Sequence, residues 1–338
     1  MKKISLILPI FLLLFMVGNV RAIDISSCSE LNQTGATYYL TQDIIDSSAT
    51  TCMDITANNI TLDCQGHVID GTDAFGINHG IYSFQKNNIT IKNCIISDWF
   101  AGIFFSRSDY NTLTNITANS NKYGLIFDFS DYNIISDSNL INNTYYDFFL
   151  DTDKTELDCH IELINITGTD NKPIVFYNSS VTIENWNNNA SEIILCGADN
   201  SVINNLVMSH SDMKSNGLYL IATNLTNITN SIINNSDIAI ELFDSHSNIL
   251  TNITVNSNNY GFWIVGNSNI LTNITANSNS KEGIELIDSN FTIIKNSKVE
   301  NNSRYGIYLL ESGNNLIYNN LFNNTNNFYF DEFWSSWL

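Results

Sequence analysis

Five residues at a regular spacing are the strongest candidates for chemistry in this 338-residue chain. Each stands two places after a Gly or Ala, and they recur with a period of about 22 residues: Tyr219, Glu241, Trp263, Glu285 and Tyr308. Aromatic rings stack on the flat faces of sugars, and carboxylates accept hydrogen bonds from hydroxyl groups. If one surface collects these side chains, the pattern predicts a binding column for a carbohydrate chain. The alternative is that strand propensity alone places Tyr and Trp on the surface.

The two glutamates of this column raise an enzymatic alternative. In a parallel sheet the backbones of Glu241 and Glu285, two strands apart, would be separated by about 9.6 Å. That separation is near the upper limit for the two carboxyl groups of an inverting glycosidase. Neither glutamate has an evident neighbour in the sequence to raise its pKa. Binding is therefore the leading interpretation, and no catalytic residue is assigned.

An internal repeat shows which elements must position these residues. A small residue followed by a large apolar one recurs at the same near-constant spacing in two blocks: Gly102-Ile103 and Gly124-Leu125, then Gly217-Leu218, Ala239-Ile240, Gly261-Phe262, Gly283-Ile284 and Gly306-Ile307. Apolar and other residues alternate after each pair, which is typical of strands. The repeat therefore predicts an all-β fold, a parallel β-helix with about 22 residues per coil, whose successive coils pair in register.

Asparagine is the most abundant residue type and the outlier of the composition. Asn tolerates the left-handed conformation, bonds its own backbone in turns and can stack on the same residue one coil away. We therefore expect it at the corners, and the spacing suggests two stacks: Asn111 with Asn133, and Asn248 with Asn269, Asn290 and Asn314. Sixteen Asn-x-Ser/Thr sequons occur, and we expect a minority to carry glycans.

Charge and composition exclude several classes of partner. The chain carries 34 acidic and 14 basic residues, a net charge of −20. Such an acidic surface argues against nucleic acid or anionic lipid as a partner. The hydrophobic fraction of 43% is large enough for a continuous core.

The chain divides into a leader, a cap and a solenoid. Residues 1–22 are typical of a secretory signal peptide, with Lys2 and Lys3 before an apolar run too short for a membrane span. Residues 23–55 precede the first recognisable coil and are expected to cap it. The β-helix is predicted over 56–330, as one domain with an irregular middle at 150–199, and 331–338 form a C-terminal tail. No membrane span is predicted in the mature chain, which we place outside the cell, at its surface or in a periplasm.

Six cysteines in an exported chain can be oxidised, and no CxxC spacing suggests zinc. Cys28 and Cys52 flank the expected cap, which makes them the first predicted disulfide. The further pairs, Cys64 with Cys94 and Cys159 with Cys196, follow in chain order. For Cys64 and Cys94, free thiols stacked in a ladder remain the alternative.

Several phrases resemble the right-handed parallel β-helix repeat family. Besides the coils they are Leu62–Gly71 and Asn88–Cys94, and the segments Asn171–Tyr177 and Glu192–Cys196 resemble an interruption found in NosD-like helices. The chain is similar to NosD-like modules and to carbohydrate-binding and sugar-hydrolysis modules of secreted archaeal and bacterial proteins. The resemblance implies a right-handed single-stranded solenoid. It leaves function open, since this fold hosts lyases, hydrolases, epimerases, adhesins and accessory proteins.

The resemblance also implies two chemistries that can be checked against the residues. Lyases of this fold use an Arg or Lys base beside acidic calcium ligands, and neither Arg107 nor Arg304 stands in an Asp cluster. A NosD-like role suggests copper, and Met208, His210 and Met213 would place two thioethers around an imidazole, ligands that suit a cuprous ion. Five Met and five His are few, so a polar loop with incidental Met is the better interpretation.

The sequence thus predicts a secreted or cell-surface β-helix that binds extracellular carbohydrate or has a structural or adhesive role. A carbohydrate-active enzyme, whether polysaccharide lyase, glycoside hydrolase or epimerase, is the first alternative. A NosD-like periplasmic accessory protein for copper delivery is the second. No cofactor is predicted, and calcium is the one ion left open.

Overall fold

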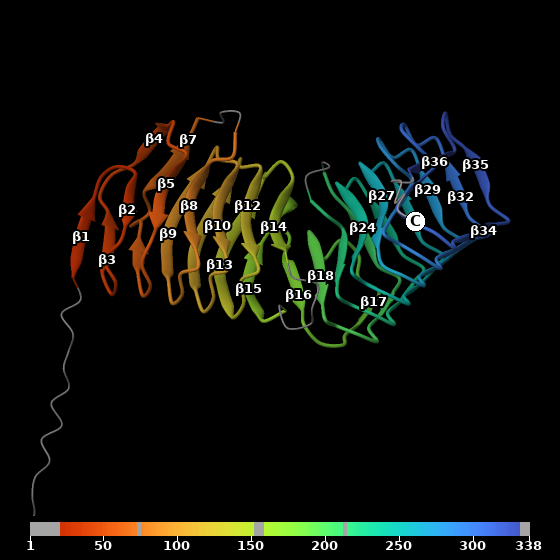
Figure 1. Ribbon diagram of the computed structural model, residues 1–338, viewed down its shortest axis with the longest axis horizontal. Coiled ribbons are helices and arrows are strands. Elements are labelled where there is room, and N and C mark those ends of the chain that lie inside the picture. Colours follow the sequence, from red (N-terminus) through yellow and green to blue (C-terminus); the bar gives the residue numbers. More distant parts are fainter. Residues whose placement is uncertain (1–20, 73–75, 152–158, 212–214, 332–338) are drawn as a thin grey trace, which may run out of the picture.

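The computed structural model describes residues 21–72, 76–151, 159–211 and 215–331. The expected signal peptide lies outside this range except for Arg21 and Ala22, and so do Met213 and all of the expected tail except Asp331. The described chain winds into a right-handed parallel β-solenoid of about 13 turns (Figure 1). The predicted fold class is therefore confirmed.

The N-terminal half of the solenoid contains two sheets. The larger has nine strands: β1 (Ala22–Ile25), β3 (Thr37–Leu40), β4 (Ile44–Ser47), β6 (Thr61–Asp63), β7 (Val68–Gly71), β9 (Thr90–Ser97), β11 (Thr112–Asn119), β13 (Asn133–Ile141) and β15 (Ile161–Thr167). The other, sheet N, has six: β2 (Ser29–Leu31), β5 (Thr51–Ile55), β8 (His79–Phe84), β10 (Ala101–Ser106), β12 (Tyr123–Asp128) and β14 (Tyr146–Asp151). The segment expected to act as a cap thus supplies β1 to β5, which pair in parallel with later coils.

The C-terminal half has three sheets. Sheet C has eight strands: β16 (Ile174–Tyr177), β18 (Glu192–Cys196), β21 (Leu218–Ile221), β24 (Ile238–Phe243), β27 (Tyr260–Val265), β30 (Ile284–Ile287), β33 (Ile307–Leu310) and β36 (Phe328–Asp331). A seven-stranded sheet follows it along each coil: β17 (Thr182–Glu184), β19 (Val202–Asn204), β22 (Asn227–Thr229), β25 (Ile249–Thr251), β28 (Ile270–Thr272), β31 (Ile293–Lys295) and β34 (Leu316–Tyr318). The third sheet has six strands: β20 (Val207–Ser209), β23 (Ile232–Asn234), β26 (Thr254–Asn256), β29 (Thr275–Asn277), β32 (Lys298–Glu300) and β35 (Leu321–Asn323). One 3-10 helix, η2 (Thr169–Asn171), precedes β16.

Asparagine forms the corners as its conformational freedom predicts. Asn115, Asn252 and Asn273, each the first residue of an Asn-Ile-Thr phrase, have φ of 55°, 58° and 54°. This left-handed backbone turns the chain between an inward apolar residue and the next strand. Inside the coil, buried Asn258 donates its backbone N–H to the side-chain oxygen of Asn279 at 3.0 Å, and the pattern continues through later coils.

One expected asparagine stack is wrong in its third and fourth members. Asn248 does stack on Asn269, which accepts its backbone N–H at 2.9 Å. The next residue in that position is Thr292, not Asn290, because Ile270 pairs with Ile293. Thr292 in turn donates its N–H to Asn315, not Asn314. The coil that starts at Asn269 is longer than the one before it. A prediction that assumes a constant number of residues per coil therefore assigns the wrong residues to this position.

Two hydrophobic cores lie one on each side of sheet C. Its residues alternate between the cores: Ile194 and Tyr219 belong to the N-terminal core, while Ile193 and Leu218 belong to the C-terminal core. Every residue of β18 and β21 is therefore buried. Among the described residues, no strand belongs to both sheet N and sheet C. The two halves meet near β14 to β18, in the middle of the molecule (Figure 1).

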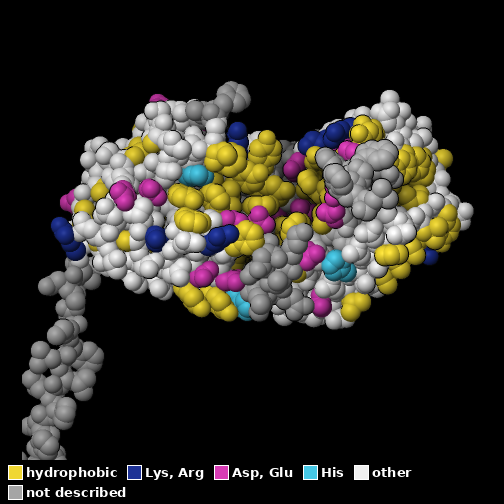
Figure 2. Space-filling view, in the orientation of Figure 1, with side chains coloured by type: hydrophobic (Ala, Val, Ile, Leu, Met, Phe, Trp, Pro, Cys, Tyr) yellow, Lys and Arg dark blue, Asp and Glu magenta, His cyan; other side chains and the backbone are white. Residues whose placement is uncertain are grey.

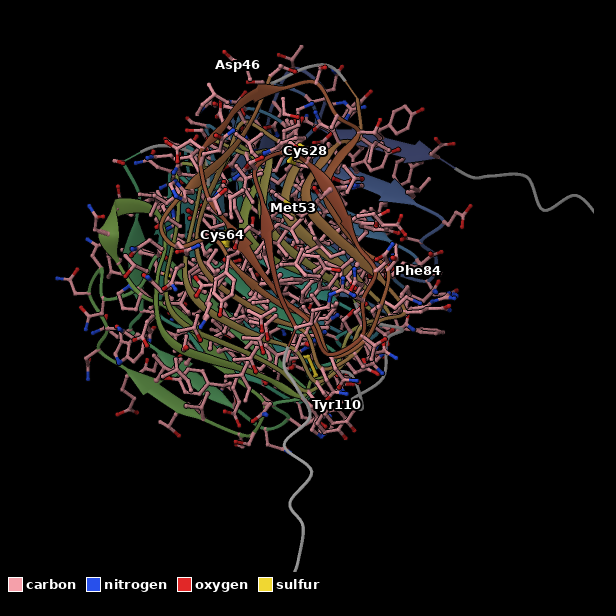
Figure 3. The ribbon with its side chains drawn as sticks, turned by 90° about the vertical axis from the view of Figure 1, so that its left-hand side faces the viewer. Cys28, Asp46, Met53, Cys64, Phe84 and Tyr110 are labelled. Carbon is pink, nitrogen blue, oxygen red and sulfur yellow. A yellow bond between two sulfur atoms is a disulfide. The ribbon has the colours of Figure 1, made fainter. Side chains whose placement is uncertain are left out.

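All three disulfides lie in the N-terminal half or at this junction. The structure pairs Cys28 with Cys52, Cys64 with Cys94 and Cys159 with Cys196, the pairs expected from the sequence. Figure 3 looks at the N-terminal end, where Met53 lies inside the coil and Phe84 and Tyr110 lie at its edge. The Cys159–Cys196 bond joins the segment just before β15 to the last residue of β18 and so fixes the last N-terminal coil onto sheet C.

Candidate functional site

The five residues singled out by their spacing form one continuous column on sheet C. In the strand register Tyr219 lies beside Glu241, and Glu241 lies beside Trp263. Trp263 lies beside Glu285, and Glu285 lies beside Tyr308. The repeat positions these side chains because each follows a small residue at which the backbones of adjacent coils come close. A Cβ on Gly261, for example, would lie 2.4 Å from the carbonyl oxygen of Gly283.

Two members of the column are buried, although the sequence analysis expected all five to face solvent. Tyr219 is 3% exposed and Glu241 is 7% exposed, whereas Trp263, Glu285 and Tyr308 are half-buried. The side chains do point out of their own coil. At this position, however, the last N-terminal coil packs against sheet C, and the hydroxyl of Tyr219 donates to the carbonyl oxygen of Leu150 at 3.5 Å.

The N-terminal half supplies a second wall that our sequence analysis missed. Tyr123 of β12 stacks on Tyr146 of β14, with ring centroids 5.7 Å apart and planes 7° apart. Phe149 lies 5.0 Å from Tyr146. The same rule of two places after the small residue selects Ile126 after Gly124, and Phe149 is its partner on β14. The rule therefore reaches Phe149 but not the two tyrosines.

A cavity of about 450 Å³ lies between the two walls. Its lining comes from both halves: Tyr123, Tyr146, Phe149 and Asp151 on the N-terminal side, and Tyr219, Glu241, Phe243, Trp263, Val265, Ile287 and Asp288 on the C-terminal side. Hydrophobic and acidic side chains gather at the junction of the halves in Figure 2. Three members of the column thus line a groove together with residues from a much earlier part of the chain.

Burial sets the electrostatics of this groove. It raises the pKa of Glu241 to about 8, and the nearby negative charge of Asp237 adds to the shift. The Asn216 amide donates to the Glu241 carboxyl group at 3.4 Å. Burial also raises the pKa of Glu285 to about 7, with Glu282 adding to the shift and Arg304 opposing it. At neutral pH the Glu241 carboxyl is thus mainly protonated, a state in which it can donate a hydrogen bond.

Two further carboxyl groups lie buried behind the groove. Burial raises the pKa of Asp147 to about 6, although Asn143 and Thr169 donate hydrogen bonds to it. Glu192 is 2% exposed, and burial raises its pKa well above the ordinary value, with contributions from Asp147 and Glu241. One of its carboxyl oxygens has no hydrogen-bond partner among the described residues. Buried acids with raised pKa values are characteristic of functional sites.

The residues considered for copper do not fit that metal. Met208 is fully buried in the C-terminal core. Both ring nitrogens of His210 are engaged, one with the Ser191 carbonyl at 2.8 Å and the other with the Ser236 hydroxyl at 3.1 Å. Met213 lies outside the described residues. Within the described part of the chain, no cluster of three or more His, Cys, Asp or Glu side chains could hold a metal ion.

Coils, register and handedness together define a right-handed parallel β-helix protein. Residues 162–322 match the family described as a right-handed beta helix region, and residues 32–192 match the family described as periplasmic copper-binding protein (NosD). Over these two ranges the chain is similar to the β-helix repeat family and to NosD. No curated protein matches the sequence. No helix in the described ranges is long and apolar enough to cross a membrane.

Several solved structures are similar to this chain at low sequence identity. The A-module of a mannuronan C-5 epimerase from Azotobacter vinelandii is 11% identical over 89% of this chain and 88% of its own, with a TM-score of 0.40. An alginate lyase from Paenibacillus sp. is 13% identical over 91% and 99%, with a TM-score of 0.36. A DFA-IIIase from Arthrobacter chlorophenolicus is 9% identical over 87% and 81%, with a TM-score of 0.38.

Proposed function

We propose that this protein binds carbohydrate outside the cytoplasm, in the groove between its two halves. The observation that carries the proposal is the composition of the two walls. Aromatic rings from β12, β14, β21 and β27 face a cavity that also contains the Glu241 carboxyl group. Rings supply flat apolar surfaces for sugar faces, and a few polar groups fix the orientation of a ligand. Three disulfides support a location in an oxidising compartment.

The column extends this site beyond the cavity. Glu285 and Tyr308 continue past Trp263 along sheet C, and the Tyr308 ring stacks on Tyr329 at 5.1 Å. Successive strands lie about 4.8 Å apart, so rings and carboxylates recur along the solenoid axis. A saccharide chain lying parallel to this axis would contact several members of the column at once. An extended polysaccharide or surface glycan therefore fits the site better than a single sugar.

The experiment is a glycan-array screen followed by affinity electrophoresis in polysaccharide-containing gels, with and without calcium. Trp263→Ala should reduce binding by about tenfold or more, because it removes a stacking surface. Tyr318→Ala is the matched control, since Tyr318 is also partly exposed, at 40%, but lies on another sheet. Unchanged glycan binding by the Trp263 variant would show that the groove is not the site.

A second candidate, glycoside hydrolysis, is favoured by one observation. The pKa values of Glu241 and Glu285 are raised to about 8 and about 7, which suits proton transfer near neutral pH. Their strands flank β27, so their backbones are about 9.6 Å apart, near the upper limit for an inverting pair. If the protein hydrolyses a bound glycan, the Glu241→Gln, Glu285→Gln double variant should lose turnover while retaining binding. Turnover that persists in the double variant would exclude this pair as the catalytic residues.

A further inference from the structure

We propose that the outer face of sheet N is a second sugar-binding surface, over which a long, β-linked saccharide chain extends from the groove. This inference rests on the proposed function and specifies the length and the linkage of its ligand. Three observations carry it: a column of rings on sheet N, the packing that holds these rings, and a polar column beside them.

The column of rings crosses four adjacent strands of sheet N. Tyr82 of β8 lies beside Phe104 of β10 in the strand register. Ile126 of β12 comes next, and Phe149 of β14 is the last member. The three rings are half-buried, and we call them the sheet-N platform. Phe149 also lines the cavity between the two halves, so the platform is continuous with the groove. Figure 2 shows hydrophobic side chains across this half as far as the junction.

Neighbouring rings hold the platform in place. Tyr82 stacks on the buried ring of His79, with ring centroids 5.0 Å apart and planes 17° apart. Phe104 meets Tyr82 edge to face at 5.5 Å, and Phe149 lies 5.8 Å from Tyr123. A side chain that is already ordered loses little conformational freedom when it binds a ligand. The platform is therefore a preformed surface.

The repeat builds this platform with the same motif as the column on sheet C. In both sheets a ring on the outer face contacts a second ring three residues earlier in the chain, at 5.0 to 5.8 Å. The pairs are His79 with Tyr82 and Tyr146 with Phe149 on sheet N, and Tyr260 with Trp263 and Tyr305 with Tyr308 on sheet C. If this motif binds sugar on sheet C, the equivalent surface on sheet N should bind sugar as well.

A polar column runs beside the platform. Ser106, two residues after Phe104, lies beside Asp128 and donates a hydrogen bond to its carboxylate. Burial raises the pKa of the Tyr82 hydroxyl, and the charges of Asp54 and Asp128 add to the shift, so both carboxylates lie near this ring. A pyranose has an apolar face of C–H groups and an edge of hydroxyl groups. Rings beside hydroxyl and carboxylate acceptors match both parts of a sugar.

The length of the platform favours one type of linkage. Tyr82 and Phe149 are three strands apart, which is about 14 Å. Equatorial linkages, as in β-1,4-linked glucose, give an extended chain that can keep its sugars against all three rings. Axial linkages at the anomeric carbon, as in α-1,4-linked glucose, wind the chain into a helix and carry it off the surface. The platform therefore fits a β-linked chain.

The test is titration calorimetry with 1,4-linked oligosaccharides. The probes are the hexamers of β-linked glucose, mannose and xylose, the hexamer of α-linked glucose, and the dimer of the β-linked sugar that binds best. We expect at least one β-linked hexamer to bind about tenfold more tightly than the α-linked hexamer and than its own dimer, because it contacts more rings. An α-linked hexamer that binds as tightly as every β-linked one, or a dimer that binds as tightly as its hexamer, would overturn the inference.

Variants of the platform separate this inference from the proposed function. Phe104→Ala should weaken hexamer binding about three- to tenfold, the effect of one aromatic contact, and Tyr82→Ala should act in the same direction. Dimer binding should not change, because neither ring lines the cavity. Tyr110→Ala is the matched control, since this exposed ring lies between β10 and β11, off the platform. If hexamer binding depends on Trp263 but on neither platform ring, the groove binds carbohydrate and the platform inference fails. If it depends on none of the three rings, both proposals fail.

Discussion

The two halves of the solenoid solve the same folding problem in different ways. The N-terminal half uses strands of eight or nine residues, such as β9, β11 and β13, and has disulfides between its coils. The C-terminal half divides the same stretch of coil into two strands of three residues, such as β25 and β26. It contains no cysteine after Cys196, and its coils are held by buried asparagine ladders and an apolar core, which the N-terminal half has in addition to its disulfides.

This difference shows why the groove forms where it does. The N-terminal half ends in an aromatic wall on sheet N, and the C-terminal half begins with a sheet that is buried on both faces. Neither half alone encloses the Glu241 carboxyl group. The site is therefore a property of the junction, and variants that uncouple the halves should affect binding more than variants within either half.

The largest effects should come from the two cores. Phe262→Ala and Phe127→Ala each remove a fully buried ring, from the C-terminal and N-terminal core respectively. Each should lower the free energy of unfolding by about 3–5 kcal/mol. Because coils contact mainly their neighbours, each loss should be concentrated in its own half. Urea unfolding measures the free energy of unfolding, and hydrogen exchange measures how much protection each half loses. If both variants lost protection equally in both halves, the two cores would not be separate. Phe84→Ala, at a site that is 43% exposed, is the control.

The junction disulfide should come next. Replacing Cys159 and Cys196 by Ala opens a bridge between residues 37 positions apart, which should lower the free energy of unfolding by about 3–4 kcal/mol. Glycan binding should weaken as well, because β14 is then held less firmly against sheet C. The matched control is the Cys64→Ala, Cys94→Ala variant, which opens a bridge away from the groove. Equal binding by the two double variants would mean that this bridge does not position the groove.

A smaller effect should follow from breaking a ladder in either half. Asn279 accepts the backbone N–H of Asn258, and Asn121 accepts that of Trp99 in the N-terminal half. Replacing either by Ala leaves a buried N–H without a partner and should cost about 2 kcal/mol. Asn277→Ala, which removes an exposed side-chain bond from Asn301 at a position without a left-handed backbone, should cost less than about 1 kcal/mol. Thermal unfolding of the three variants measures these differences, and a negligible cost at Asn279 would show that the buried ladder contributes little stability.

A further expected effect is a change in the pH dependence of stability. The pKa of Glu241 is raised in the folded protein from its usual 4.5 to about 8. The folded state therefore binds a proton that the unfolded state loses, so this contribution to stability is complete below pH 4.5 and declines as the pH rises towards 8. The Glu241→Gln variant should show a flatter profile of unfolding free energy between pH 5 and pH 8. Identical profiles for wild type and variant would indicate an unperturbed carboxyl group.

The fold and the column were predictable because the repeat fixes the phase of every coil. A slip of one residue would turn each apolar side chain outward, so the recurring Gly-Ile pairs determine which residues share a face. The register of Glu241 beside Trp263 follows directly from that phase. The disulfide pairs followed from chain order and from equivalent positions in neighbouring coils.

The burial of Tyr219 and Glu241 could not be predicted in this way. It depends on packing between β14 and sheet C, a contact between residues 69 positions apart in the case of Tyr219 and Leu150. The period is interrupted between them, so the repeat gives no register across the junction. The raised pKa of Glu241 results from this packing and was missed for the same reason. The phase rule applied to the first block selects Ile126 and its partner Phe149, but it does not select Tyr123 or Tyr146 of the aromatic wall.

The central claim is that both halves contribute to a single glycan site. Hydrogen–deuterium exchange with and without a bound oligosaccharide tests it most directly, because it reports on each strand separately. The account predicts simultaneous protection of peptides from β12 and β14 on one side and from β24, β27 and β30 on the other. Protection confined to one half, or located on another face such as the exposed ring of Tyr110, would contradict it.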